Sequence, residues 1–221
     1  MPDDAKAYLN NCLTPNIFKM ILEPKLQLQR IKQHPKVIFP LFLIVLISIM
    51  GFIFVAQGID MINDNSEVLR MSEGELGLYL LFSQLIFAII GFLTPIILIV
   101  FTSLIYYLIG KLLKSQASYI HYLSLMTFVS LPIALQIFMN GILFIVFGDI
   151  HGDYTMFTSL NILFGETGLL GGLLVGLEIF SIWFLILLAL GLRIVAQYSR
   201  KATMITISLT IITSLLFSTF M

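Results

Sequence analysis

The acidic residue that is most clearly placed to do chemistry is Glu178, because it lies inside a long apolar run. A carboxylate within a membrane is costly, so acids at such positions face a helix bundle or a cavity and often mark ion or proton routes. Gln136 and Asn140 lie one helical turn apart in a second apolar run, and Gln84 lies in a third. We expect Glu178 to hydrogen-bond Asn140 or Gln136 in the interior of the bundle.

Two roles are open for this polar cluster. The first is a structural clasp between helices, which contributes roughly 0.6–2 kcal/mol per hydrogen bond. The second is a route for an ion or a lipid through a small transporter, flippase or channel. The clasp is favoured, because the apolar runs carry no array of acids and bases for a proton relay. A Glu178→Gln variant that keeps its fold but loses function would count against the clasp.

A stripe of small residues precedes Glu178. Gly168, Gly172 and Gly176 form two successive GxxxG steps, and such a stripe lets another helix approach closely. The stripe fits packing within the bundle or a homo-oligomer contact, of which intramolecular packing is the commoner outcome.

The composition places these residues in a membrane protein. The chain has 221 residues, of which 59% are hydrophobic and 11% charged, whereas a soluble domain carries about 25% charged residues. This composition excludes a soluble enzyme, a disordered protein and a nucleic-acid binder with a basic surface. A helix needs roughly 20 apolar residues to cross the ~30 Å hydrocarbon core. Five runs satisfy this length and predict an all-α, five-transmembrane-helix bundle: 38–59, 79–110, 119–147, 169–195 and 203–221.

Two of these spans contain a proline. Pro95 lies in the second span and Pro132 in the third. A proline removes one backbone hydrogen bond and bends a helix, so we expect each span to be one kinked helix. The alternative for the second span is a re-entrant pair that splits at Pro95, but its first half is too short to cross.

The charges predict the orientation. Of the 12 basic residues, 11 lie in the leader and in the loops after the second and fourth spans, whereas the other loops hold eight of the 12 acids. Short basic loops stay in the cytoplasm. The N-terminus is therefore predicted inside and the C-terminus outside, in the cell (plasma) membrane. The zero net charge is a cancellation between a basic inner face and an acidic outer face.

The chain divides into a cytoplasmic leader, 1–37, and a five-span membrane domain, 38–221. Within the leader, segment 24–34 has Leu28 and Ile31 on one helical face and basic residues elsewhere. This pattern favours a short basic amphipathic helix on the inner leaflet. The alternative is a basic leader that only sets orientation.

No catalytic set is present. The chain has one cysteine and three histidines and lacks a phosphate loop, a serine elbow and an HExxH motif. Segment 148–153 imitates a metal motif of calcineurin-like phosphoesterases, but the other histidines, His34 and His121, are predicted on the opposite side of the membrane. We therefore expect no enzyme activity, no cofactor and no metal.

Three segments carry a family resemblance. The leader has a Pro-bearing amphipathic stretch before the first span, segment 107–132 ends in Ser-Leu-Pro at Pro132, and segment 182–201 contains Gly191-Leu192-Arg193. With the five spans, these segments resemble the Yip (Ypt-interacting protein) domain family in its bacterial form. The inner-loop glycines usual in that family are replaced by Lys114-Ser115-Gln116, and the eukaryotic Asp-Leu-Tyr-Gly-Pro motif is missing.

The resemblance implies a function through partners. Eukaryotic members bind prenylated Rab-type GTPases, a role that the missing motif argues against here. Some bacterial members are associated with ABC-type efflux systems that protect cells from toxic peptides. We expect an accessory or scaffold protein in the lipid bilayer that docks other membrane proteins, ABC-type transporter subunits among them, and that binds no nucleic acid.

Overall fold

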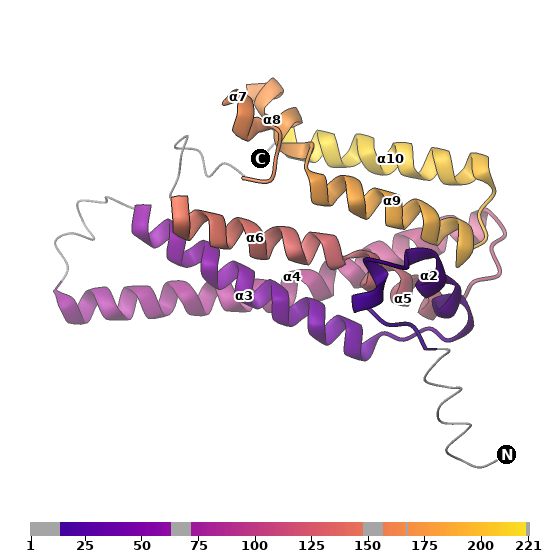
Figure 1. Ribbon diagram of the computed structural model, residues 1–221, viewed down its shortest axis with the longest axis horizontal. Coiled ribbons are helices and arrows are strands. Elements are labelled where there is room, and N and C mark those ends of the chain that lie inside the picture. The colour runs from indigo at the N-terminus through magenta and orange to yellow at the C-terminus, as the bar shows by residue number, and fades with distance from the viewer. Residues whose placement is uncertain (1–13, 63–71, 148–156, 167, 220–221) are drawn as a thin grey trace, which may run out of the picture. The chain divides into compact units, whose positions relative to one another are not determined.

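The chain is helical over most of its described length. The computed structural model describes residues 14–62, 72–147, 157–166 and 168–219 (Figure 1). Apolar runs favour helices because lipid offers no partner to open backbone groups. In chain order the elements are η1 (Phe18–Met20), α2 (Pro24–Gln33), α3 (Ile38–Ile62), α4 (Glu73–Leu112), α5 (Tyr119–Val129), α6 (Leu131–Phe147), α7 (Asn161–Phe164), α8 (Gly168–Gly176), α9 (Ile179–Ile194) and α10 (Arg200–Thr219).

The structure has the helices of a multi-pass membrane protein. Three apolar stretches among the described residues are long enough to cross a membrane: Ile38–Gly58, Gly74–Leu112 and Tyr119–Phe147. A shorter apolar helix, α9, follows them. The all-helical, multi-pass prediction is confirmed at this level.

The second predicted span is a single helix. Pro95 lies inside the unbroken α4, so the one-helix prediction is confirmed. The helix is longer than predicted, with 40 residues. At about 1.5 Å per residue it measures about 60 Å, twice the ~30 Å of a hydrocarbon core.

The third predicted span is divided just before its proline. The segment is divided at Ser130 into α5 and α6, two residues before Pro132. Proline has no N–H to bond the carbonyl one turn earlier, which weakens the helix at this point. The Met126 carbonyl, one turn before Ser130, accepts hydrogen bonds from the Ser130 N–H at 3.0 Å and from the Ser130 hydroxyl at 2.7 Å.

The fourth predicted span is broken, so the prediction of one continuous helix over 169–195 is wrong. Leu177 and Glu178 separate α8 from α9. The Leu177 carbonyl accepts a hydrogen bond from the Leu160 N–H at 3.1 Å, and Glu178 pairs with Ser159 in an isolated antiparallel bridge. Four of the nine residues of α8 are glycine, which lowers helix stability, so a competing backbone partner can interrupt the helix.

The chain divides into two compact units, which are described separately. Unit 1 comprises Met1–Leu43, Leu98–Leu131 and Phe184–Thr210. Its buried core includes Tyr122, Leu125, Phe128, Leu188 and Leu192. Within this unit α9 turns back through residues 195–199 into α10 (Figure 1).

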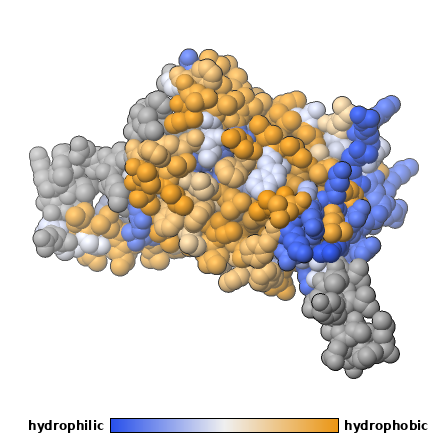
Figure 2. Space-filling model, in the orientation of Figure 1, coloured by the Kyte–Doolittle hydropathy of each residue, from blue (hydrophilic) through white to orange (hydrophobic). Residues whose placement is uncertain are grey.

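Helix α2 is present with nearly the predicted bounds, but its apolar face is covered by protein. Leu28 and Ile31 are fully buried, and α2 packs against α5 within unit 1. These two side chains therefore face protein, and the position of α2 at the inner leaflet stays a prediction. The exposed apolar side chains near this helix include Phe18, Ile21, Leu22 and Leu26. Figure 2 shows hydrophilic side chains gathered around α2, while apolar side chains cover much of the visible surface.

Unit 2 comprises Ile44–Ile97, Pro132–Trp183 and Ile211–Met221, and glycines set its helix packing. A Cβ atom on Gly141 of α6 would lie 2.6 Å from the Gly51 carbonyl oxygen of α3. A Cβ on Gly91 of α4 would lie 2.8 Å from the Ile49 Cα of α3. Since real Cβ atoms do not approach backbone this closely, α3 packs on α4 and α6 only because these positions are glycine.

Candidate functional site

Asn140 is the centre of the polar cluster in unit 2. Its side-chain amide donates hydrogen bonds to the Thr158 hydroxyl at 2.9 Å and to the Gln136 carbonyl oxygen at 3.0 Å. Its amide oxygen accepts a hydrogen bond from the Thr158 N–H at 3.3 Å. The side chain is 3% exposed. Asn140 therefore fixes residue 158 to α6 with bonds to both backbone and side chain.

Glu178 lies at the break between α8 and α9 and is almost fully buried, with 2% of its surface exposed. The Thr158 side chain is close enough to interact with its carboxyl group. Neither carboxyl oxygen, however, has a hydrogen-bond partner among the described residues. The hydrogen bond predicted from Glu178 to Asn140 or Gln136 is thus not made, because Asn140 bonds Thr158 instead.

Two predicted members of the cluster differ in their surroundings. The side-chain oxygen of Gln136, one turn before Asn140 on α6, is buried and unbonded within the described part of the chain. Gln84 is half-buried on α4, and none of the hydrogen bonds found between described residues joins it to Asn140 or Thr158. Among the described residues, Thr158 therefore interacts with Asn140 and Glu178, whereas Gln136 is linked to Asn140 through its backbone carbonyl.

The predicted glycine stripe forms α8. At Gly168, where φ is +66°, a Cβ would meet no described atom within 4 Å, and Gly172 and Gly176 are half-buried. The close helix contacts of unit 2 occur at other glycines, among them Gly51 and Gly141. A contact of the stripe with another chain stays a prediction.

The segment 148–153, which imitates a metal motif, lies outside the described residues, as do parts of the loops on which the orientation was predicted. Within the described ranges, no group of three or more His, Cys, Asp or Glu side chains is placed to hold a metal ion.

The family-signature residues have structural roles in the described helices. Pro132 is buried at the start of α6, where the predicted third span is divided. A Cβ on Gly191 of α9 would overlap the Leu125 side chain of α5, so glycine permits these helices to pack within unit 1. Arg193 is exposed in the last turn of α9, where a cation complements the helix dipole.

A hydroxyl network holds unit 1 together, and sequence reasoning did not identify it. The Tyr198 hydroxyl donates to the Tyr106 carbonyl at 2.9 Å, and the Tyr122 hydroxyl reaches Tyr198 at 3.5 Å. Burial raises the pKa of the Tyr198 phenol, so its proton remains available for donation. Their position near the ends of spans is typical of aromatic belts at the membrane interface and does not indicate a hydroxyl network.

Ser124 of α5 makes the other polar contact that the sequence did not reveal. Its hydroxyl donates to the Lys36 carbonyl at 2.7 Å and accepts from the Lys36 N–H at 3.1 Å. One side chain thus satisfies both backbone groups of Lys36, just before α3 begins. The available signal was a serine in an apolar helix, which is too common to predict a particular partner.

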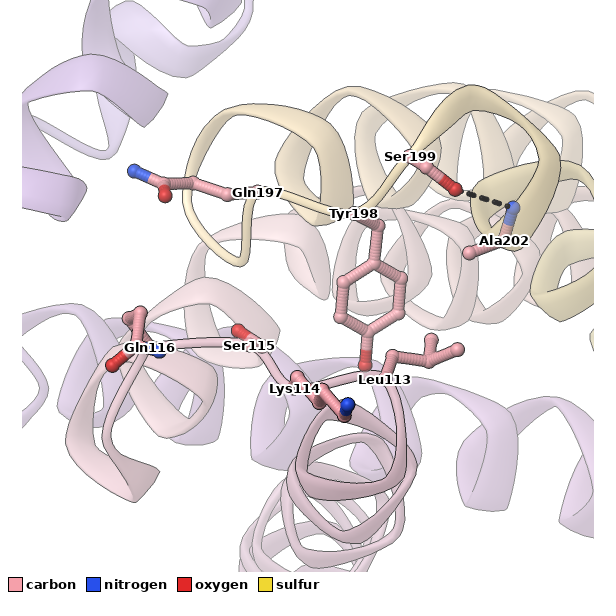
Figure 3. Close-up of a pocket in the computed structure, with 8 residues that line it drawn as sticks. All are labelled: Leu113, Lys114, Ser115, Gln116, Gln197, Tyr198, Ser199 and Ala202. Atoms are coloured by element: carbon pink, nitrogen blue, oxygen red, sulfur yellow. Dashed lines mark hydrogen bonds between the residues drawn. The ribbon is translucent and has the colours of Figure 1, made fainter.

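A pocket of about 240 Å³ lies beside this network. It is lined by residues 113–116 and 197–199 and by Ala202, and Figure 3 shows the Tyr198 ring directed toward Leu113 and Lys114. Lys114 and Gln197 both have φ of 59°, a region that favours glycine. The inner-loop position where the resembled family usually has glycine therefore keeps a glycine-type backbone with lysine in place.

Comparison with known proteins gives one family and one relative. The Yip1 domain matches residues 18–221, which include every helix from η1 to α10. "Membrane protein YknW" of Bacillus subtilis (strain 168) is 32% identical over 197 residues, which are 85% of this chain and 81% of that protein. No solved structure matches the chain.

Proposed function

Because the chain belongs to the Yip1 domain family, we propose that it is an accessory or scaffold protein that docks other membrane proteins. The observation that carries this proposal is the surface of α4. Only 11% of the apolar window of α4 is buried, compared with 28% for α3 and 39% for the α5–α6 stretch. Among the three described stretches long enough to cross a membrane, the longest is therefore the one that the rest of the protein covers least.

The exposed face of α4 is open to lipid and to a helix from another membrane protein. It presents large apolar side chains along its length, such as Phe82, Phe92 and Phe101. Helices associate in membranes through close packing and through polar contacts. A helix of about 60 Å is too long for an upright position in the bilayer, so a tilted or projecting α4 offers surface along much of this length.

The docking protein has the following topology in this proposal. Five spans cross the cell membrane, with the N-terminus in the cytoplasm and the C-terminus outside. The support is the distribution of the charges, since basic side chains such as Lys25, Lys36 and Lys201 are exposed in unit 1 and basic segments stay in the cytoplasm. From the family resemblance, an ABC-type export complex is the partner to test first.

Site-specific photocrosslinking in native membranes tests the docking role. A benzophenone amino acid replaces Phe101, which is 59% exposed on α4, and in a matched variant replaces Ile99, which is 3% exposed on the same helix. We expect a reproducible adduct with another membrane protein at Phe101, roughly fivefold stronger than at Ile99. Recovery of only lipid adducts, or only of this protein, from both variants would reject the docking role.

A further inference from the structure

The break between α8 and α9 combines two features that are costly in a membrane. The first is the unwound backbone at Leu177 and Glu178, in the middle of an apolar segment. Irregular backbone at membrane depth is tolerated where it is buried in protein or lines a cavity. Here the Leu177 carbonyl is bonded to the Leu160 N–H and Glu178 is 2% exposed, although Leu177 itself is 40% exposed.

The second feature is the buried carboxyl group itself. Its two oxygens are unbonded among the described residues, and the side-chain oxygen of Gln136 is likewise buried and unbonded. A buried carboxylate without a compensating charge or hydrogen bond is expensive. A fold that only needed a polar clasp would use these oxygens as acceptors, as it uses the amide oxygen of Asn140.

The described segments near Glu178 supply no positive charge to it. Helices α6 and α8 carry no titratable side chain, residues 157–166 carry only Glu166, which is exposed, and α9 carries only Arg193, at its far end. Arg193 is 15 residues along the chain from Glu178 and belongs to unit 1, whereas Glu178 belongs to unit 2. The charge that would balance the carboxylate must come from outside these segments.

We propose that Glu178, with the Thr158 hydroxyl beside it, binds a single small monovalent cation, a proton or an alkali-metal ion. A carboxylate and neutral oxygen groups are the donors that hard cations prefer, and an unwound segment between two half-helices is a common place for such a site in membrane proteins. Asn140 positions the site, because it holds Thr158 through both hydrogen bonds. The inference does not depend on the docking role and requires no transport across the membrane.

Carbodiimide labelling of the full chain in liposomes tests the site. Dicyclohexylcarbodiimide enters lipid and adds to a protonated carboxyl group, and mass spectrometry of the Glu178 peptide measures the product. If the site binds a proton, labelling falls at least roughly tenfold between about pH 5 and about pH 9. If it binds an alkali-metal ion, adding sodium or potassium chloride at constant pH and ionic strength, with choline chloride as the control, lowers labelling roughly fivefold or more.

Two variants locate the effect. Glu178→Gln abolishes labelling of this peptide, while exposed Glu166 reports reaction outside the site. Thr158→Val keeps Glu178 but removes the hydroxyl. We expect the proton or salt concentration that gives half-maximal labelling to change at least roughly threefold. The proposal is overturned if Glu178 is not labelled at any pH, or if its labelling is unaffected by pH and by either salt. Loss of the crosslinks from α4 would not change these readouts, so the two proposals fail separately.

Discussion

The two units differ in what their buried polar groups bond. In unit 1, the hydroxyls of Ser124 and Tyr198 each join a backbone group that is distant in sequence. The buried side-chain nitrogen of Gln27 is without a partner among the described residues, but its oxygen accepts the Asn16 N–H at 2.8 Å. In unit 2, by contrast, the Glu178 carboxyl is buried with no hydrogen bond from described residues.

The bonded hydroxyls of unit 1 stabilise the fold, whereas the unbonded carboxyl group of Glu178 in unit 2 destabilises it. A paired buried hydroxyl contributes about 0.5–1.5 kcal/mol, whereas an unpaired buried group costs about 1–3 kcal/mol or more. Unit 2 tolerates this cost because its helices pack at backbone distance through glycines such as Gly51 and Gly141. The bonded hydroxyls of unit 1 therefore stabilise it, whereas unit 2 is tightly packed and contains a buried carboxyl group that lowers its stability.

The largest loss of stability is expected when a packing glycine of unit 2 is replaced. Gly141→Leu introduces a side chain where a Cβ alone would lie 2.6 Å from the Gly51 carbonyl oxygen. Because the obstacle is backbone, the helices must separate, and we expect a loss of about 3 kcal/mol or failure to accumulate in membranes. Thermal unfolding in detergent and the amount of protein in membranes measure this.

Gly77→Ala is the matched control for this substitution. Gly77 lies within α4, and a Cβ there would meet no described atom within 4 Å. Alanine should leave stability unchanged or raise it by roughly 0.5–1 kcal/mol. Equal losses from both variants would show that unit 2 is not packed through its glycines.

A smaller loss of stability is expected when the hydrogen bonds between Ser124 and Lys36 in unit 1 are removed. Ser124→Ala removes the hydroxyl that bonds both the N–H and the carbonyl of Lys36, and two partly buried backbone groups lose their partner. We expect a loss of about 1–3 kcal/mol, measured by thermal unfolding in detergent. Ser118→Ala, at an exposed hydroxyl that bonds His121, should cost less than about 0.5 kcal/mol. Equal losses of stability in the two variants would contradict a stabilising role for the Ser124 hydroxyl.

Features that depend on local sequence could be predicted. Uninterrupted apolar runs predicted α3 and α4, and the spacing of Leu28 and Ile31 predicted α2. The break before Pro132 follows from the missing N–H of proline. These predictions hold because each depends on residues within a few turns of one another.

Features that depend on distant partners could not be predicted. The break at Glu178 requires the Leu160 N–H to bond the Leu177 carbonyl. No residue within the fourth predicted span indicates that partner. The same limit applies to the choice of packing glycines, because Gly51 and Gly141 meet across two helices and belong to no GxxxG step. Glu178 and Asn140 were identified from their chemistry, but Thr158, which interacts with both, was missed because a threonine in a loop carries no such signal.

The smallest effect expected on stability is that of Glu178→Gln, and it tests the comparison most sharply. If the carboxyl burdens the fold, its replacement by a neutral amide of similar size leaves the unfolding free energy unchanged or raises it by about 1 kcal/mol. Asn140→Ala is the matched control in the same unit, because it removes hydrogen bonds to Thr158 and Gln136 and should cost about 1–3 kcal/mol. Thermal unfolding of both variants in detergent decides the matter. A loss for Glu178→Gln as large as that for Asn140→Ala would mean that the carboxyl is a clasp after all, and that the two units use their buried polar groups in the same way.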